Sequence, residues 1–285
     1  MYVIAEIGCN HKGEIEIAEE MVKTAKTFCG VDAVKFQKRN PKKCLTEEQY
    51  NAPHPNPENS YGGTYGEHRE RLEFTISQHD YLRRLCRVNH VDYGCSVWDI
   101  ESLEEIIPIQ PDFIKLPSAH NMNIPLLEAA ITEYDGPLHI SLGMTHLTEE
   151  HAIVKKVYTL AEDGRTVVLY ACTSGYPVQF KDLCLKEIER LRCMYGQYGF
   201  NIGYSGHHLG IAADIAAMTL GAECIERHFT LNRTWKGTDH AASLEHDGMR
   251  RLVRDLKNVK QALTFKPDTM LEVEQEQRRK LKCLR

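Results

Sequence analysis

The stretch DFIKLPSAHNMNIPLLEAAITEYDGPLHISLG, residues 112–143, decides the fold class of this chain. It opens with the short strand-like run DFIKLPS and closes with a second one, LHISLG. Between them, IPLLEAAITEY repeats apolar residues at intervals of three and four, which is the spacing of one helix face. A strand, a helix and a strand in this order predict a parallel βαβ unit.

The same alternation continues in both directions along the 285 residues. Helix-like segments such as 15–28 and 149–163 separate eight strand-like runs, which predicts a single α/β domain of the (β/α)8 TIM-barrel class. No G-x-G-x-x-G follows the first run, so a dinucleotide-binding fold is not favoured. We expect the barrel to span residues 1–265 and a charged tail to span 266–285. The runs are VIAEIG from Val3, AVKFQ from Ala33, VDYGCSV from Val91, DFIKLPS from Asp112, LHISLG from Leu138, TVVLYAC from Thr166, NIGYSGH from Asn201 and CIERHFT from Cys224.

Composition and charge exclude several classes of function. A net charge of -5 argues against a nucleic-acid surface, which needs a basic excess. The ten cysteines are scattered without a C-x-x-C pair, which is typical of free buried thiols in a reducing cytoplasm. No signal peptide precedes the first strand, and no apolar run approaches the roughly 20 residues that span a bilayer. We therefore expect a cytoplasmic protein without a membrane partner.

One connection, residues 38–71, is unusually long and polar. It is rich in Pro, Asn, Gly and Tyr, as in NAPHPNPENSYGGTYGEHRE. Such a segment is either a disordered insertion or a lid over a binding site. Its aromatic and charged residues follow a strand end, which favours the lid.

Polar residues gather at the ends of the predicted strands. In a TIM barrel the carboxyl ends of the strands form one face, and catalytic residues lie on that face. The candidate site residues are Glu6, Lys35, Gln37, Ser96, Lys115, Ser118, Ser141, Tyr176, Ser205, His207, His228 and Asp239.

Two lysines lie within apolar strands, Lys35 in AVKFQ and Lys115 in FIKLP. A lysine is rarely buried without a partner, and an anion in the barrel mouth is one natural partner. Serines on neighbouring strands add hydroxyl donors suited to a phosphate or carboxylate. The alternative is that each lysine pairs with a core carboxylate such as Glu6 or Glu226.

Two histidines, His207 and His228, fall on adjacent strands near the same face. Two imidazoles in this arrangement are able to bind a divalent metal, with water and substrate at the other positions. The alternative is a pair of core histidines without a ligand. His208 follows His207 directly and should point to the other side of the strand, which makes it the weaker candidate.

The motifs at these strand ends resemble those of the sialic acid synthase family, over nearly the whole chain. The two segments GYSGH and TWKGTDHAASLE are most similar to the animal-type branch, which uses a 6-phosphorylated acylmannosamine. The matching segments are AEIGCNHKG, VKFQK, TYGEHRERLEF, FIKLPSAHNMNIPLL, ISLGM, CTSGYP, GYSGHH and ERHFTLNRTWKGTDHAASLE.

The resemblance implies a reaction that joins phosphoenolpyruvate to an open-chain sugar aldehyde and releases inorganic phosphate. By motif, His207 and His228 would bind Mn2+, with Mg2+ or Co2+ as alternatives, and Glu6 would lie beside the reacting carbons. Gln37, Tyr176 and Asp239 would contact the sugar. The residues implied to hold phosphoenolpyruvate are Lys35, Ser96, Lys115, Ser118, Ser141 and Ser205.

The resemblance covers the barrel domain alone. Family members usually carry a C-terminal antifreeze-like domain that reaches into a partner subunit's site, and this chain ends about where that domain would begin. A homo-oligomer is nevertheless expected. Two alternatives remain open: a related synthase with another acceptor, such as mannose 6-phosphate or a pentose phosphate, and a non-catalytic barrel that binds a sugar phosphate.

Overall fold

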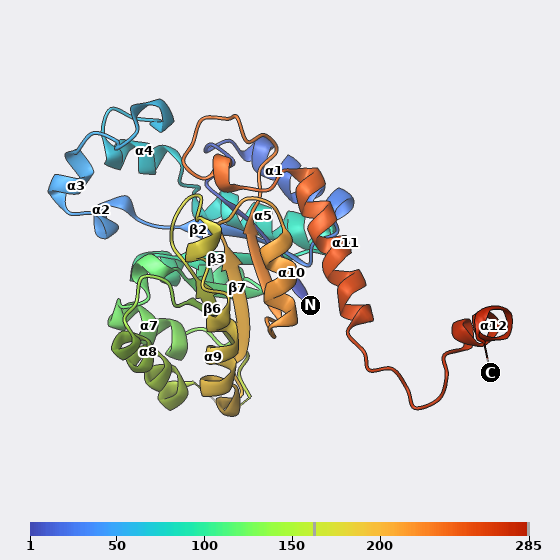
Figure 1. The fold of residues 1–285 in the computed structure, drawn as a ribbon. Helices are drawn as coiled ribbons and strands as arrows, with labels where there is room; N and C mark the ends of the chain where they lie inside the picture. Colours follow the sequence, from blue (N-terminus) through green and yellow to red (C-terminus); the bar gives the residue numbers. More distant parts are fainter. Residues whose placement is uncertain (162–163, 284–285) are drawn as a thin grey trace.

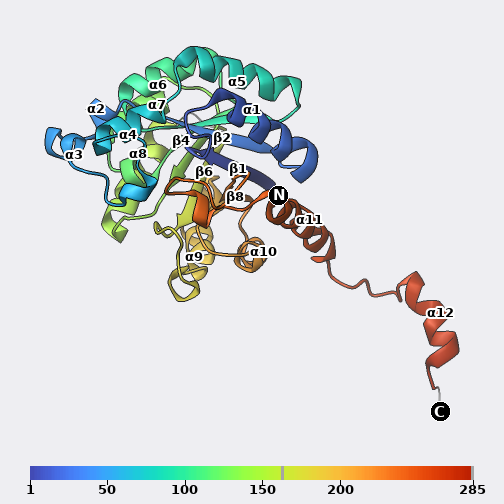
Figure 2. The same ribbon diagram turned by 90° about the horizontal axis from the view of Figure 1, so that it is seen from above.

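A computed structural model describes residues 1–161 and 164–283. Its eight strands pair in parallel with their sequence neighbours, and β1 pairs with β8, so the sheet closes into a barrel (Figure 2). All eight predicted strands are present, which confirms the TIM-barrel prediction. The strands are β1 (Tyr2–Gly8), β2 (Ala33–Lys38), β3 (Asp92–Val97), β4 (Phe113–Leu116), β5 (Leu138–Ser141), β6 (Val167–Cys172), β7 (Asn201–Gly206) and β8 (Cys224–His228).

Helices surround the barrel, and their apolar faces pack against the strands. The predicted helix at 15–28 is α1, continued by a π-helical turn from Ala25 to Cys29. Most of the segment predicted at 149–163 belongs to α8. Its last two residues, 162 and 163, lie outside the described residues. The surrounding helices are α1 (Ile15–Thr24), α5 (Ile76–Val88), α6 (Ile100–Ile106), α7 (Ile124–Thr132), α8 (Leu147–Leu160), α9 (Lys186–Tyr195), α10 (Ala212–Thr219) and α11 (His246–Ala262).

The barrel interior changes from apolar to charged along the strands. A small apolar cluster fills its amino-terminal part and includes Ile4, Ala33, Phe113 and Cys224. Side chains that face the same way recur every second residue in a strand. Two residues beyond each of these four therefore point inward as well, and they are charged: Glu6, Lys35, Lys115 and Glu226. The interior of the barrel therefore has an apolar layer at its amino-terminal end and a charged layer next to it, towards the carboxyl ends of the strands.

The long segment after β2 is ordered and folds into three short helices, so the disordered alternative is wrong. They are α2 (Pro41–Cys44), α3 (Glu47–Asn51) and α4 (Tyr65–Arg71), and Figure 1 shows them together beside the barrel. Capping boxes at Thr46 and Thr64 begin α3 and α4. The Tyr61 hydroxyl donates to the carbonyl of Lys236 at 2.5 Å, which joins this segment to the loop after β8.

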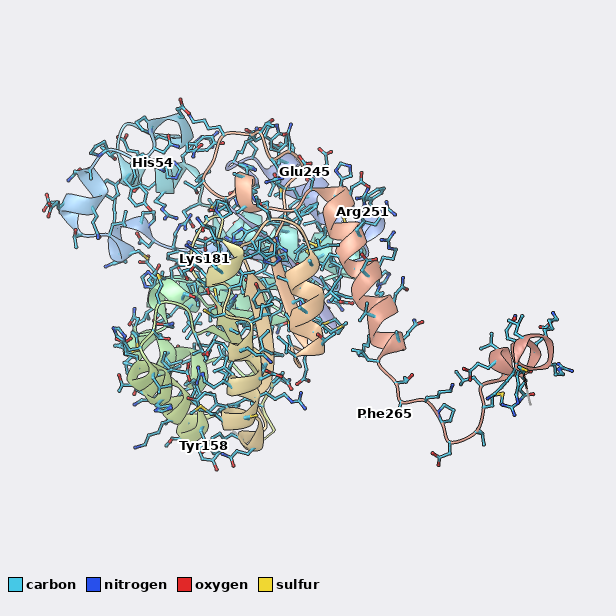
Figure 3. The ribbon with its side chains drawn as sticks, viewed as in Figure 1. His54, Tyr158, Lys181, Glu245, Arg251 and Phe265 are labelled. Atoms are coloured by element: carbon cyan, nitrogen blue, oxygen red, sulfur yellow. The ribbon has the colours of Figure 1, made fainter. Side chains whose placement is uncertain are left out.

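Beyond α11 the chain leaves the barrel. Phe265, labelled in Figure 3, is fully exposed on this connection, and the terminal helix α12 (Glu272–Leu281) has no buried residue. Figures 1 and 2 both show α12 projecting away from the other helices. None of the helices within the described ranges is long and apolar enough to cross a membrane. All ten cysteines are free thiols, but Cys184, Cys193 and Cys283 are exposed, so the expectation of buried thiols is wrong for these three.

Candidate functional site

A cavity of about 280 Å³ lies at the carboxyl ends of the strands, and it collects the predicted site residues. All of them line it except Asp239. The residues come from all eight strands or the loops that follow them, because each strand delivers its last inward-facing side chain to the same face. The lining comprises Glu6, Lys35, Gln37, Ser96, Trp98, Lys115, Pro117, Ser118, Ala119, Ser141, Met144, Cys172, Ser174, Tyr176, Ser205, His207, Glu226 and His228.

The two buried lysines pair with two buried glutamates at the base of this cavity. Lys35 Nζ lies 2.6 Å from Glu6 Oε2 and 3.8 Å from Glu226 Oε2. Lys115 Nζ donates to Glu226 Oε1 at 2.6 Å. The carboxylate pairing considered for the lysines is therefore present in the structure. Because the four charges form one network that opens into the cavity, the pairing leaves an incoming anion within reach of both ammonium groups.

The network shifts the pKa values of its two carboxyl groups in opposite directions. Burial would raise the pKa of Glu226, but Lys115 and Lys35 hold that pKa well below its usual range. Burial raises the pKa of Glu6, and the negative charge of Glu226 adds to the effect. Two neighbouring carboxyl groups with opposed shifts are a common arrangement for separate roles in proton transfer and charge stabilisation.

Serine hydroxyls extend the network. Lys35 Nζ donates to Ser96 Oγ at 2.7 Å, and Ser205 Oγ donates to Glu226 Oε1 at 3.1 Å. Ser118 and Ser141 line the same cavity beside Lys115. Two ammonium groups surrounded by four hydroxyls form a donor set suited to a phosphate or carboxylate.

The two imidazoles face each other at the edge of the cavity. The ring centroids of His207 and His228 are 5.4 Å apart. His207 Nδ1 donates to the carbonyl of Thr173 at 3.0 Å, which leaves the Nε2 lone pair free for a ligand. His228 Nδ1 is buried without a hydrogen-bond partner, and burial lowers the pKa of His228 to about 4. Burial opposes protonation of His207, but interactions with Cys172 and with the carbonyl of Thr173 raise its pKa. The facing geometry of the two imidazoles nevertheless fits a divalent ion.

In the described part of the chain, no third protein ligand joins these two imidazoles. Across residues 1–161 and 164–283, no three His, Cys, Asp or Glu side chains form a metal-binding group. A metal held by two imidazoles keeps several positions open for water and substrate, which is typical of catalytic rather than structural sites.

The predicted sugar contacts surround the histidine pair. The ring of Tyr176 lies 4.4 Å from that of His207. Gln37 Nε2 donates to Glu6 Oε1 at 2.8 Å. Asp239 Oδ2 lies 3.9 Å from His228 Nδ1, just outside the cavity lining. Burial would raise the pKa of Asp239, but the protonated form of His228 and the guanidinium of Arg69 favour the carboxylate and lower that pKa, so Asp239 is ionised at neutral pH.

His208 points away from this site, as predicted. It is fully buried, and its Nε2 lies 3.3 Å from Asp214 Oδ2. Arg227 Nη1 donates to the same carboxylate oxygen at 2.5 Å. This cluster lies behind β7 and β8 and links both strands to α10.

Several lining residues were not predicted, and Glu226 is the most important of them. It lies two residues before His228 on β8, so the strand period alone places both on the inward face. Sequence reasoning considered Glu226 only as a partner for the lysines. Trp98, Cys172 and Ser174 also line the cavity. Cys172 and Ser174 lie in the CTSGYP motif, whereas nothing in the local sequence distinguishes Trp98 from a core or loop residue.

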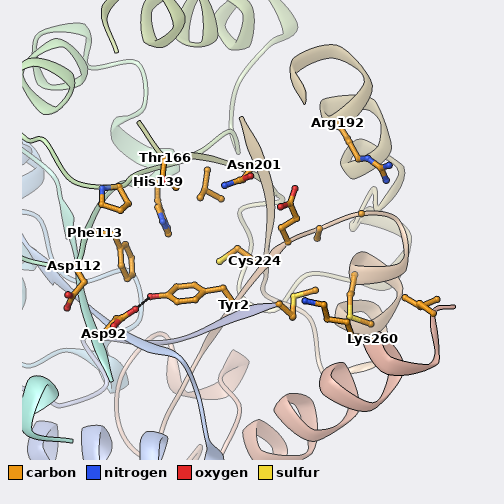
Figure 4. Close-up of a pocket in the computed structure, with 18 residues that line it drawn as sticks. Tyr2, Asp92, Asp112, Phe113, His139, Thr166, Arg192, Asn201, Cys224 and Lys260 are labelled. Atoms are coloured by element: carbon orange, nitrogen blue, oxygen red, sulfur yellow. Dashed lines mark hydrogen bonds between the residues drawn. The ribbon is translucent and has the colours of Figure 1, made fainter. Parts of the chain in front are cut away.

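A larger cavity of about 860 Å³ lies at the opposite, amino-terminal end of the barrel (Figure 4). Tyr2, Phe113, His139 and Cys224 form its floor, and the Tyr2 hydroxyl donates to Asp92 Oδ2 at 2.5 Å. It contains none of the predicted site residues. Since TIM-barrel chemistry takes place at the carboxyl-terminal face, the smaller cavity is the candidate active site.

The closed parallel barrel and the smaller cavity at its carboxyl-terminal face define the class of the protein. It is a TIM-barrel enzyme with its site at the strand ends. The sequence pattern of the NeuB family matches residues 21–267. The chain is 36% identical to the N-acetylneuraminate-9-phosphate synthase of Mus musculus over 263 residues, covering 92% of this chain and 71% of the relative. The chain belongs to the NeuB family.

Two further similarities agree with this assignment. The N-acetylneuraminate-9-phosphate synthase of Drosophila melanogaster is 39% identical over 265 residues, which cover 91% of this chain and 68% of that protein. The crystal structure of N-acetylneuraminic acid (sialic acid) synthetase from Leptospira borgpetersenii superposes with a TM-score of 0.81 at 26% identity. That superposition covers 98% of this chain and 92% of the other.

Proposed function

We propose that this protein condenses phosphoenolpyruvate with an aldose of the N-acetylmannosamine type to give a 2-keto-3-deoxy sugar acid and inorganic phosphate. One observation carries the proposal: a lysine–serine anion site and a facing pair of imidazoles open into the same small cavity. The first suits the phosphate and carboxylate of phosphoenolpyruvate. The second suits a metal-assisted aldehyde.

The lysines would hold phosphoenolpyruvate in place. Lys115 and Lys35 would turn from Glu226 and Glu6 toward the anion, and Ser96, Ser118, Ser141 and Ser205 would donate to its oxygens. Fixing both reactants in one cavity contributes on the order of 7–11 kcal/mol to lowering the barrier. The lysines are therefore proposed to act mainly by positioning.

The remaining residues would act on the reacting carbon atoms or bind the sugar. C3 of phosphoenolpyruvate attacks the aldehyde carbon, whose oxygen becomes an alkoxide and takes up a proton, and the new carbon–carbon bond leaves positive charge at C2. Water adds at C2 and loses its protons as the C2–O bond to phosphate breaks, which gives the ketone and inorganic phosphate. When bound by His207 and His228, a divalent ion, proposed as Mn2+ with Mg2+ or Co2+ as alternatives, supplies Lewis-acid stabilisation to the aldehyde oxygen. Glu6 is proposed to stabilise the C2 cation or orient the water. Gln37, Tyr176 and Asp239 would hold the sugar hydroxyls.

Phosphate release tests the proposal directly. Phosphoenolpyruvate and Mn2+ would be incubated with N-acetylmannosamine, its 6-phosphate, mannose, mannose 6-phosphate or arabinose 5-phosphate. Release with an N-acetylmannosamine acceptor is the expected result. Release with a different acceptor alone would establish the related synthase instead. A folded, metal-loaded protein that releases no phosphate with any acceptor would overturn the proposal in favour of a binding-only barrel.

Lys115→Ala is expected to raise the KM for phosphoenolpyruvate at least about tenfold, because a hydrogen bond to a charged group contributes about 1.5–3 kcal/mol. Initial rates at varied phosphoenolpyruvate would measure it. Lys155→Ala, at an exposed position on α8, is the matched control and should leave KM unchanged. An unchanged KM in the Lys115 variant would refute the anion site.

We also propose that residues 1–265 form the catalytic unit and that 266–285 is a tail outside it. The proposed setting is cytoplasmic, with a homo-oligomer as the assembly and no nucleic-acid or membrane partner. Gel filtration with light scattering would test the assembly, and a monomer at working concentration would contradict it.

A further inference from the structure

A buried ion cluster lies directly behind the two candidate metal ligands. Its members are His208, Asp214 and Arg227, and each has at most 1% of its surface exposed. Arg227 Nη1 donates to Asp214 Oδ2 at 2.5 Å and lies 3.1 Å from His208 Nε2. Asp214 comes from α10, which packs against β7 and β8 on the outside of the barrel (Figure 1). Substrate cannot reach these side chains, so any effect on the reaction has to pass through the residues that they hold.

Two members of the cluster are direct chain neighbours of the metal ligands. His208 follows His207, and Arg227 precedes His228 on β8. Successive side chains of an extended chain point to opposite sides. Each ligand therefore points into the cavity while its neighbour points back toward α10. Whatever holds the neighbour in place also limits how far the backbone that carries the imidazole can shift.

Arg227 holds the backbone just beyond His207 in place. Its Nη2 donates to the carbonyl of His208 at 2.6 Å, and its Nη1 donates to the carbonyl of Gly210 at 2.9 Å. The pairing of β7 with β8 ends at Gly206 and Arg227, so His207 lies one residue outside this ladder. The two hydrogen bonds therefore continue the connection between the strands past the point where the ladder stops.

Stability alone is a poor reason for a charged cluster at this place. The desolvation of two buried charges offsets their attraction, and apolar side chains of similar volume often stabilise a fold as much or more. The cluster is also incompletely paired, since Asp214 Oδ1 and Arg227 Nε are buried and have no hydrogen-bond partner in the described part of the chain. A guanidinium does supply something that an apolar side chain lacks, which is a set of donors in a fixed plane. The cluster therefore contributes direction more than stability.

We propose that Arg227 and Asp214 are positioning residues for the metal site. Arg227 fixes the turn after His207 to β8, and Asp214 fixes the guanidinium of Arg227 to α10. The inference rests on the proposed function, in which His207 and His228 bind a divalent ion. Without the cluster, the separation and the orientation of the two imidazoles would vary, and the ion would be bound more weakly. Residues that orient metal ligands typically change metal affinity by about 10–100-fold.

A purely structural role for the cluster has a different signature. Asp214→Asn leaves a buried guanidinium without its carboxylate, which lowers stability whichever role is correct. The double variant Asp214→Ala, Arg227→Met removes both charges, so no buried charge is left unpaired and part of that stability should return. If the cluster only stabilised the fold, the affinity for a metal ion would return together with the stability. If the cluster positions the imidazoles, the affinity stays low in the double variant.

Equilibrium dialysis against Mn2+ alone tests the inference, at a temperature where circular dichroism shows each variant to be folded. Asp214→Asn and the double variant are both expected to raise the Kd for Mn2+ at least about tenfold over the wild type. Glu150→Gln is the matched control, because Glu150 Oε2 pairs with Arg190 Nη2 at 2.6 Å between α8 and α9, away from the site. It should lower stability and leave Mn2+ binding unchanged. A wild-type Kd in a folded cluster variant would overturn the inference.

Turnover provides a second readout that a general loosening of the barrel would not reproduce. In the double variant, a higher concentration of Mn2+ should restore phosphate release, while the KM for phosphoenolpyruvate stays at its wild-type value, because Lys35 and Lys115 lie on β2 and β4. A KM that rises as much as the Kd for Mn2+ would contradict a positioning role. A wild type that binds no Mn2+ would instead remove the metal site from the proposed function, and this inference with it.

Discussion

His207→Ala is expected to abolish phosphate release while leaving the barrel folded. A bound metal contributes several kcal/mol of transition-state stabilisation, and each 1.36 kcal/mol is a factor of ten in rate, so the loss should reach at least about a thousandfold. The folded state loses one hydrogen bond, from Nδ1 to the carbonyl of Thr173, which costs about 1 kcal/mol. Phosphate release and circular dichroism would measure the two effects separately.

A second readout makes the test independent of turnover. Equilibrium dialysis against Mn2+ should show weaker binding in His207→Ala than in the wild type. His151→Ala, at an exposed position on α8, removes an imidazole away from the site and should leave both activity and metal binding intact. Wild-type activity or undiminished Mn2+ binding in the His207 variant would eliminate this residue as a ligand.

Glu226→Gln is expected to cause the largest loss of stability among single changes in the site. The substitution leaves Lys115 without its carboxylate and removes one of the two partners of Lys35. Removing one member of a buried ion pair costs about 3–5 kcal/mol. In a protein of this size that corresponds to a fall in Tm of roughly 10 °C. Differential scanning calorimetry would measure it.

A partly exposed pair provides the control for this change. Glu105→Gln breaks the contact with Lys38, in which the glutamate is 39% exposed, and should cost less than about 1 kcal/mol. Phosphoenolpyruvate should raise the Tm of Glu226→Gln more than that of the wild type, because an anion replaces the lost charge. Equal shifts in both proteins would mean that the ligand does not reach the lysines.

The sign of the pH effect follows from the lowered pKa of Glu226. A carboxyl group whose pKa is lower in the folded state stabilises the fold above its unfolded pKa, about 4.3, and loses this contribution as the pH falls toward the folded value. The difference in free energy of unfolding between the wild type and Glu226→Gln should therefore have its full size at neutral pH and become smaller below about pH 4. A difference that widens in acid would contradict the assignment of the charge.

The candidate site could be predicted from sequence to the extent that it follows the strand period. Once His228 is placed inward, Glu226 must point inward too, and the same holds for Lys35 and Gln37 on β2. Whether a buried lysine meets a glutamate or a ligand depends on strands more than one hundred residues apart, as with Lys115 and Glu226. That choice is not encoded locally, and sequence reasoning left it open.

The sequence by itself determined the eight-stranded barrel, because alternating strand and helix periods specify parallel pairing and one functional face. It also determined which polar residues end the strands. Tertiary structure alone decided how the charges pair, that Asp239 lies at the edge of the cavity, and that the segment 38–71 brings Arg69 next to Trp98. The physical reason is that local periodicity orients a side chain, whereas loop packing and long-range contacts decide what it meets.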